Sequence, residues 1–387
     1  MKNVVDRMKE NQSEKKIADF IVKQKQDYDF KKRYAAIRAW EFYNHPEIDG
    51  NCFVSVGGLD SITLYLFLRS IGIHVPGVSV SFLEDKSIQR VHKALGITCL
   101  KPALRPDGKR WNKAAIIREF GFPVLSKEIA GKISLLQHPS EKNATVRHAI
   151  ITGETGAYGG YRKGTRMKMS QKWLEKFGGY ENEAEGTDYG TPDFLVSDKC
   201  CYYLKEKPCN DYAKETGSYP YMGLMASEGG RRQKALMLNG CNYISKGTKR
   251  SAPFAIFNRQ DILTLAMEMD LWYFLHWREF GEERLETIVP AIYGEIVRDS
   301  DGTLRTTKAQ RTGCSMCGFG IHLEKRPHRF DFLYQTNPKE WEYQMYHIGQ
   351  DINGNEIGWG HVLDYIGVEW RNPEAYQDTK MRLPDCQ

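Results

Sequence analysis

The segment from Cys52 to Ile71 constrains the fold more than any other part of the sequence. A short apolar run over 52–56 has the length of a buried strand, two glycines follow it, and residues 62–71 carry apolar side chains on one helical face. The alternation continues with strand-like runs at 76–83 and 97–100 and helix-like segments at 87–95 and 112–120. Strands that alternate with helices predict an α/β fold with a mostly parallel sheet covered on both faces.

The rest of the chain is expected to add helices and loops to this sheet. Asn258, followed by Asp261 and an apolar run, predicts a capped helix start. Glycines interrupt the stretch near 151–195, which predicts loops around one helix at 170–177. The expected organisation is a helical extension over 1–45, an α/β domain over 46–270 that includes this insertion, a C-terminal helical region over 271–368 and a tail over 369–387.

Composition excludes some classes of protein. The chain has 387 residues, enough for a large core, and a net charge of +6, which suits anionic ligands such as nucleotides or nucleic acids without identifying one. No run of 18 apolar residues is present, and the charged N-terminus lacks the apolar core of a signal peptide. We therefore expect no membrane partner and a cytoplasmic location.

The glycine turn is the first candidate site. Backbone amides at a turn between a strand and a helix bind phosphate or sulfate, and Gly57 and Gly58 allow the chain to approach an anion closely. Ser55 and Ser61 can add hydroxyl groups, and Asp60 can cap the helix or hold Mg²⁺ on bound phosphates. The alternative is a plain Gly-Gly turn in an α/β sheet.

Nine cysteines provide the second candidate site. In a reducing cytosol, clustered cysteines are more often metal ligands or redox groups than disulfides, and an odd number fits a closed disulfide set poorly. Four of them form a tandem pair and a Cys-x-x-Cys loop: Cys200, Cys201, Cys314 and Cys317. Their thiolates suit an iron–sulfur cluster or zinc, and free core thiols are the third possibility. Cys209 is a spare ligand, and Cys52, Cys99 and Cys241 are expected in the core.

The glycine turn resembles the PP-loop, Ser-Gly-Gly-x-Asp-Ser, of the adenine-nucleotide α-hydrolase superfamily. That superfamily includes ATP pyrophosphatases and the phosphoadenosine phosphosulfate (PAPS) reductase family. Gly57, Gly58, Asp60 and Ser61 match the motif. Two positions depart from it, since Val56 stands where Ser is usual and Leu59 where ATP pyrophosphatases have Lys. Loss of the lysine removes a charge from the phosphates, which argues against ATP cleavage more than against nucleotide binding.

Other segments resemble the PAPS reductase family in the same order, over roughly residues 50–368. Residues 82–85 match the position of a segment around the adenosine, and residues 121–128 look like one common in bacterial and phage members. Residues 223–232 resemble an element that would place Glu228, Arg231 and Arg232 near the phosphate or phosphosulfate. For the arginines, the alternative is a solvated helix face.

The cysteine pattern is similar to the [4Fe–4S] pattern of assimilatory adenylylsulfate reductases, which implies this cluster on the four cysteines, with zinc as the alternative. The family also uses a nucleophilic cysteine on a C-terminal tail, usually within Glu-Cys-Gly-Leu-His. That motif is absent, and Cys386 is the one cysteine in the corresponding region. It is therefore the candidate catalytic residue.

Three functions are consistent with these patterns. The first is a PAPS-reductase-like iron–sulfur oxidoreductase that binds an adenine sulfonucleotide and reduces it, or transfers sulfur, with a thiol electron donor. The second is an ATP-dependent PP-loop enzyme that adenylates and thiolates nucleic acid. The third is a nucleotide- or nucleic-acid-binding module of a defence or mobile-element system that has lost catalysis. Val56 and Leu59 favour the third, whereas the cysteines, Glu228 and Arg231 favour the first two.

Overall fold

The chain divides into two compact units, each assembled from two separate segments. The computed structural model describes residues 4–80, 84, 86–154, 167–181, 188–281, 283–308, 314 and 317–376, except the side chains of 4–11, 230 and 231. Unit 1 comprises Met1–Lys101 and Pro208–Gly313, and unit 2 comprises Pro102–Lys207 and Cys314–Gln387. The contiguous domains expected from the sequence, 46–270 and 271–368, differ from this division because packing joins segments that are distant in the chain.

Unit 1 is an α/β unit around a six-stranded sheet with the strand order β3-β2-β1-β5-β7-β6. Neighbouring strands are parallel except for the edge pair β6 and β7. The strands are β1 (Cys52–Ser55), β2 (Gly77–Ser79), β3 (Thr98–Cys99), β5 (Tyr219–Tyr221), β6 (Asn242–Ser245) and β7 (Thr248–Ser251). The predicted α/β class and mostly parallel sheet are therefore confirmed.

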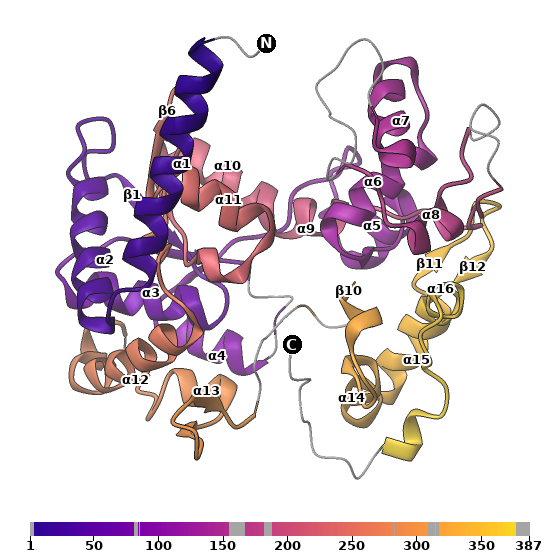
Figure 1. Ribbon diagram of the computed structural model, residues 1–387. Helices are drawn as coiled ribbons and strands as arrows, with labels where there is room; N and C mark the ends of the chain where they lie inside the picture. The colour runs from indigo at the N-terminus through magenta and orange to yellow at the C-terminus, as the bar shows by residue number, and fades with distance from the viewer. Residues whose placement is uncertain are drawn as a thin grey trace. The chain divides into compact units, whose positions relative to one another are not determined.

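Figure 1 labels the described α-helices of unit 1, which also contains a small hairpin. They are α1 (Val4–Gln24), α2 (Tyr28–Tyr43), α3 (Leu59–Ser70), α4 (Lys86–Ala94), α10 (Lys207–Thr216, from the unit boundary), α11 (Gly230–Asn239), α12 (Arg259–His276) and α13 (Val289–Tyr293). The hairpin pairs β8 (Ile296–Arg298) with β9 (Leu304–Thr306). Helix α12 begins at the predicted cap, because Asn258 and Asp261 form a capping box.

The core of unit 1 is built around α3. Every residue of α3 from Ile62 to Leu68 is buried, as is Leu59. Such a helix is apolar on most sides, which requires cover on more than one face. Helix α12 packs against it. Tyr221 of β5 is fully buried, and its hydroxyl donates to the Ala39 carbonyl of α2 at 2.7 Å, so α2 is fixed to the sheet.

Unit 2 is mainly helical. Its helices are α5 (Lys113–Phe120), α6 (Lys127–Gln137), α7 (Ala144–Thr152), α8 (Gln171–Phe177), α9 (Lys199–Cys201), α14 (Arg329–Thr336), α15 (Pro338–Tyr346) and α16 (Trp359–Ile366). A π-helical turn, Tyr202–Glu206, continues α9. Two short strand pairs are present: β4 (Val124–Leu125) with β10 (Gly318–Phe319), and β11 (Gly349–Gln350) with β12 (Glu356–Ile357).

An aromatic core joins the two segments of unit 2. Phe122 packs edge-to-face on both Phe194 and Trp359, with ring centroids 6.0 and 5.2 Å apart. All three side chains are fully buried. Parallel pairing of β4 with β10 links the same two segments next to Cys317. In the described part of the chain, no helix is long and apolar enough to cross a membrane.

Candidate functional site

The glycine turn lies at the point where the strand order of the sheet reverses. Strand β1 pairs with β2 on one side and with β5 on the other, both in parallel. The turn at Gly57 and Gly58 follows the carboxyl end of β1, and α3 begins directly after it. In open parallel sheets, ligands bind outside the carboxyl ends of the strands at such a reversal. The predicted site residues of this turn therefore occupy a position suited to a ligand.

Hydrogen bonds within unit 1 fix the shape of the turn. The Gly57 amide donates to Ser61 Oγ at 2.7 Å, and the Ser61 hydroxyl donates to the Gly58 carbonyl at 3.1 Å. The Leu59 amide donates to the Tyr293 hydroxyl of α13 at 2.8 Å. Ser61 thus closes the turn. The first amides of an α-helix have no carbonyl acceptor within the helix itself, so the start of α3 is a place where an anion can bind.

The loop after β5 packs directly on this turn. A Cβ at Gly223 would lie 2.8 Å from both the Asp60 carbonyl carbon and the Ser61 nitrogen, so only glycine allows this contact. Farther along the loop, Glu228 pairs with Arg232 of α11 at 2.7 Å, and the Arg232 side chain is 58% exposed. The Arg231 side chain lies outside the described part, as do 82, 83 and 85 of the segment expected around the adenosine.

Two polar residues at the turn were not predicted from the sequence. His92 of α4 is 2% exposed, and its Nε2 lies 2.8 Å from the Gly57 carbonyl. Burial lowers the pKa of His92, so the neutral imidazole donates this hydrogen bond. Arg259, the first residue of α12, places Nη1 3.5 Å from Asp60 Oδ1. Neither residue belongs to a segment in which the sequence predicts a ligand-binding motif.

A thiol and a buried leucine complete the surroundings of the turn. Cys209 Sγ of α10 lies 3.9 Å from Ser55 Oγ at the end of β1, so the spare cysteine belongs to unit 1. Leu59 is 3% exposed. Its side chain is therefore part of the core of unit 1. A lysine here would have to bury its charge.

All four predicted cysteine ligands belong to unit 2, where their thiols influence one another. Cys200 and Cys201 lie on α9, and Cys314 and Cys317 precede β10; all four are half-buried and free of disulfide bonds. The pKa of Cys200 is raised to about 12 and that of Cys201 to about 11, chiefly by burial. Lys113 and Lys127 act to lower these two pKa values, whereas the Cys314 and Cys317 thiols act to raise them. Packing has therefore brought two distant parts of the sequence into one region.

Aromatic packing and a glycine hold this region in place. Tyr203, just after the tandem cysteines, packs on Trp111 and Phe120 at centroid distances of 4.8 and 5.2 Å, which fixes α9 against α5. Next to Cys317, a Cβ at Gly318 would overlap the Trp359 ring. The Cys317 carbonyl also accepts a hydrogen bond from Arg329 Nη1 at 3.0 Å.

Two lysines accompany the cysteines. Burial lowers the pKa of Lys113, against the opposing influence of Cys200, Cys317 and Cys314. Burial also acts to lower the pKa of Lys127, but Cys201 and Glu206 outweigh it, so the pKa is raised. The Lys127 ammonium lies 2.6 Å from a Glu206 carboxylate oxygen. Positive charge near four thiols stabilises thiolate ligands and the negative charge of a thiolate-bound cluster.

Four cysteines are the number of ligands that one iron–sulfur cluster uses. Among the described residues, no group of three or more His, Cys, Asp or Glu side chains is arranged to hold a metal ion. One expectation about the remaining cysteines is wrong, because Cys99 is exposed. It lies on β3, a two-residue strand at the edge of the sheet.

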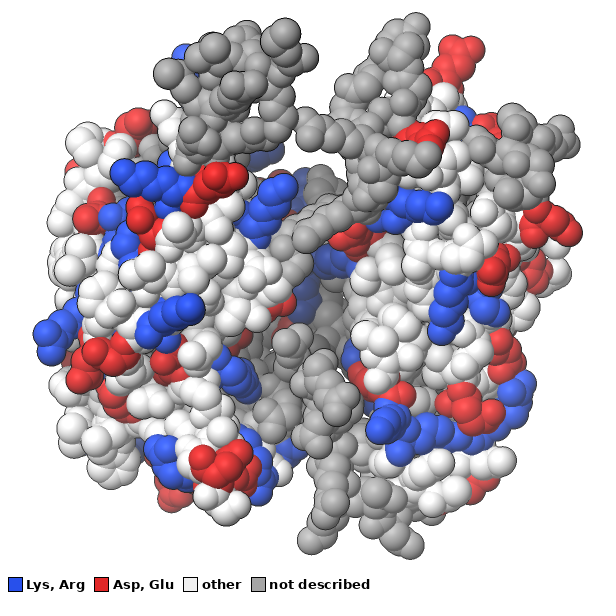
Figure 2. Space-filling view, viewed as in Figure 1, with Lys and Arg blue, Asp and Glu red and all other residues white. Residues whose placement is uncertain are grey.

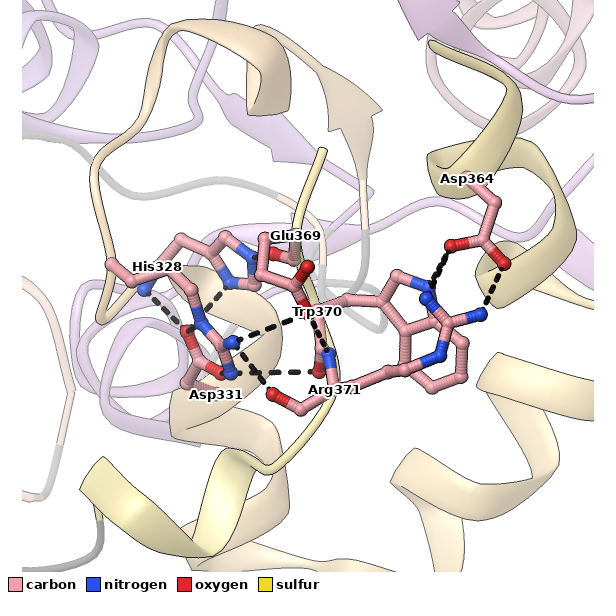
Figure 3. Close-up of polar contacts among 7 residues, drawn as sticks. His328, Asp331, Asp364, Glu369, Trp370 and Arg371 are labelled. Carbon is pink, nitrogen blue, oxygen red and sulfur yellow. Dashed lines mark hydrogen bonds and ion pairs between the residues drawn. The ribbon is translucent and has the colours of Figure 1, made fainter. Parts of the chain in front are cut away.

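The C-terminal segment is anchored to α14 (Figure 3). Arg326 and His328 both contact the buried carboxylate of Asp331. His328 Nε2 also lies 3.1 Å from the Glu369 carbonyl, and Arg326 Nη1 donates to the Arg371 carbonyl at 2.6 Å. The described chain continues to residue 376, so Cys386, the candidate catalytic residue, lies outside it.

Comparisons with protein-family models, curated proteins and solved structures find no match for this chain.

Proposed function

We propose that this protein is a PAPS-reductase-like enzyme with a PP-loop fold, which binds an adenine sulfonucleotide at the glycine turn and a [4Fe–4S] cluster on Cys200, Cys201, Cys314 and Cys317. The observation that carries the proposal is the convergence of these four free cysteines, from two distant segments, in one region of unit 2. Free thiols also agree with the cytoplasmic location expected from the sequence.

The cysteine pattern, a tandem pair followed by a Cys-x-x-Cys loop, is the reason to rank a cluster above zinc. Zinc remains the alternative, which four thiolates would hold about 2.3 Å from their sulfurs. When bound, a cluster supplies electrons or an electrostatic field through its iron and sulfur atoms. The four cysteines would hold it, and Lys113 and Lys127 would balance its negative charge.

The glycine turn would bind the anionic group of the nucleotide. The amides of Asp60 and Ser61 and the dipole of α3 favour negative charge there. In the reaction proposed, a cysteine thiolate attacks the sulfate sulfur, forming an S–S bond while the S–O bond to phosphate breaks and the nucleotide leaves with the electron pair. A donor thiol then attacks the resulting S-sulfocysteine, which releases sulfite and leaves a disulfide. Cys386 remains the predicted nucleophile.

Two other functions rank below this one. The adenylating function ranks second, because Leu59 stands where ATP pyrophosphatases have lysine. The catalytically lapsed module ranks third, because the four cysteines favour an enzyme. On the face shown in Figure 2, described Lys and Arg side chains are interspersed with Asp and Glu.

Anaerobic purification from iron-replete cells tests the cluster. We expect a brown protein with about four iron and four acid-labile sulfide per chain, since one cluster requires the four cysteines. Cys201→Ser should lose the iron. Cys99→Ser is the matched control and should keep it, because Cys99 is exposed in unit 1. A colourless protein with one zinc per chain contradicts the cluster assignment, and cleavage of ATP to AMP and pyrophosphate favours the adenylating enzyme.

A further inference from the structure

The partner of Asp60 bears on which nucleotide the glycine turn can take. From the sequence, Asp60 is a candidate to hold Mg²⁺ on bound phosphates. In the structure its carboxylate faces the Arg259 guanidinium at 3.5 Å. A carboxylate in contact with a guanidinium is a poor Mg²⁺ ligand, because the cation would have to displace or approach another positive charge.

The position of Arg259 is unfavourable for its own helix. It is the first residue of α12, where the helix dipole favours negative rather than positive charge. The capping box of Asn258 and Asp261 already satisfies this helix end, so α12 does not need Arg259. The guanidinium nevertheless extends to Asp60 in the first turn of α3, and its side chain is 35% exposed, within reach of a ligand.

The other groups at the turn offer few hydrogen-bond donors to a polyphosphate. Residue 59 is a buried leucine, so this position offers no ammonium group to a phosphate. The Leu59 amide already donates a hydrogen bond to the Tyr293 hydroxyl. The Gly57 amide is bonded to Ser61. These bonds reduce the number of amides that can hold successive phosphates. The first-turn amides of α3 and one guanidinium suit a single tetrahedral anion or a short phosphosulfate.

We propose that Arg259 is the specificity-determining cation of the glycine turn, and that Asp60 positions it, so that the turn takes an adenosine phosphate or phosphosulfate without Mg²⁺ in preference to Mg·ATP. This inference rests on the proposed nucleotide-binding function. Arg259 takes the electrostatic role that the PP-loop lysine has in the ATP pyrophosphatases, but from α12 rather than from the turn.

Calorimetric titration of the full chain with AMP, adenosine 5′-phosphosulfate and ATP, each in Mg²⁺ and in EDTA, tests the proposal. For wild type, we expect the phosphosulfate to bind with equal affinity in both buffers and more tightly than Mg·ATP. Arg259→Gln should weaken phosphosulfate binding by about 10- to 150-fold, as loss of a charge-assisted contact predicts. Arg259→Lys should restore part of that affinity, because it keeps the charge but not the planar fork.

Arg305→Gln is the matched control. Arg305 pairs with Asp299 at 2.8 Å on the β8–β9 hairpin of the same unit, so the change removes an arginine–carboxylate pair that does not include Asp60. It should leave affinity unchanged. If Arg259→Gln lowers the melting temperature but leaves the affinity for the phosphosulfate unchanged, the Asp60–Arg259 pair is purely structural and the proposal is overturned.

Three further outcomes are decisive. Binding that EDTA abolishes and Asp60→Asn destroys assigns Asp60 to Mg²⁺ and overturns the inference, while the nucleotide site stands. Equal affinity of wild type and Arg259→Gln for the phosphosulfate also overturns the inference and leaves the nucleotide site standing. If wild type binds none of the three nucleotides in either buffer, the proposed function fails, and the role of Arg259 fails with it.

Discussion

Lys31 and Asp261 form a buried ion pair that joins α2 to α12 in unit 1. The Lys31 ammonium lies 2.8 Å from Asp261 Oδ2, and the side chains are 4% and 10% exposed. The same carboxylate oxygen, Oδ2, also accepts a hydrogen bond from the Asn258 amide at 2.8 Å. One carboxylate therefore caps the helix that carries Arg259 and neutralises a lysine from the N-terminal helices.

Replacing Asp261 should destabilise unit 1 strongly. Asp261→Asn keeps the shape but leaves the Lys31 charge buried without a counter-ion, and loss of one partner of a buried pair costs about 3–5 kcal/mol. Urea denaturation measures this change in the free energy of unfolding. Lys32→Gln is the control: Lys32 pairs with Glu268 between the same helices, but the two side chains are 37% and 36% exposed, so we expect a loss of at most about 1 kcal/mol. Similar losses in the two variants contradict the prediction.

This ion pair illustrates what the sequence does and does not predict. Asn258 followed by Asp261 identifies the start of α12, because a capping box is a local pattern. Lys31 is 230 positions away, and nothing in its own neighbourhood indicates that it is buried against Asp261. The same holds for Arg259, His92 and Tyr293 at the glycine turn, which local motifs do not mark.

The sheet shows the same division between local and non-local information. Strand β1 and helix α3 follow from an apolar run, two glycines and a helical period. Strands β5, β6 and β7 were not predicted, because their sequences are short and polar or contain proline, and pairing rather than composition makes them strands. For the cysteines, the sequence indicates the ligand types, but only the fold of unit 2 brings the two pairs together.

Gly223→Ala should weaken nucleotide binding. The added Cβ would lie 2.8 Å from backbone atoms of Asp60 and Ser61, which cannot move as a flexible side chain can. We expect the first turn of α3 to shift, with a loss of about 1–3 kcal/mol in stability and of most affinity for adenosine 5′-phosphosulfate. Gly247→Ala is the control, since a Cβ there meets no atom within 4 Å. Unchanged affinity in Gly223→Ala, measured by calorimetry, means that the ligand does not contact this turn.

The Asp331 carboxylate should make the stability of unit 2 depend on acid pH. Burial acts to raise its pKa, but hydrogen bonds from His328 and Arg326 outweigh burial, so the pKa lies below its ordinary value. A lowered pKa gives stability that is complete above the unfolded value of about 3.9 and is lost as the pH falls through the folded value. Thermal unfolding of wild type between pH 7 and pH 2 should show this loss of stability. The Asp331→Asn variant should be less stable than wild type at pH 7 and should lack the loss that is due to Asp331. A variant that keeps the wild-type slope below pH 4 contradicts the assignment.

Cys386→Ser should separate binding from turnover. If the Cys386 thiolate attacks the sulfonucleotide, the serine variant should bind adenosine 5′-phosphosulfate with wild-type affinity. It should release no sulfite in the presence of a donor thiol, because a serine hydroxyl is a far weaker nucleophile than a thiolate. The chain offers a second thiol beside the turn, since Cys209 lies 3.9 Å from Ser55. Cys209→Ser is therefore the informative comparison. Sulfite release that survives in Cys386→Ser and stops in Cys209→Ser, with the iron content unchanged in both, would assign the attack to α10 instead of the tail.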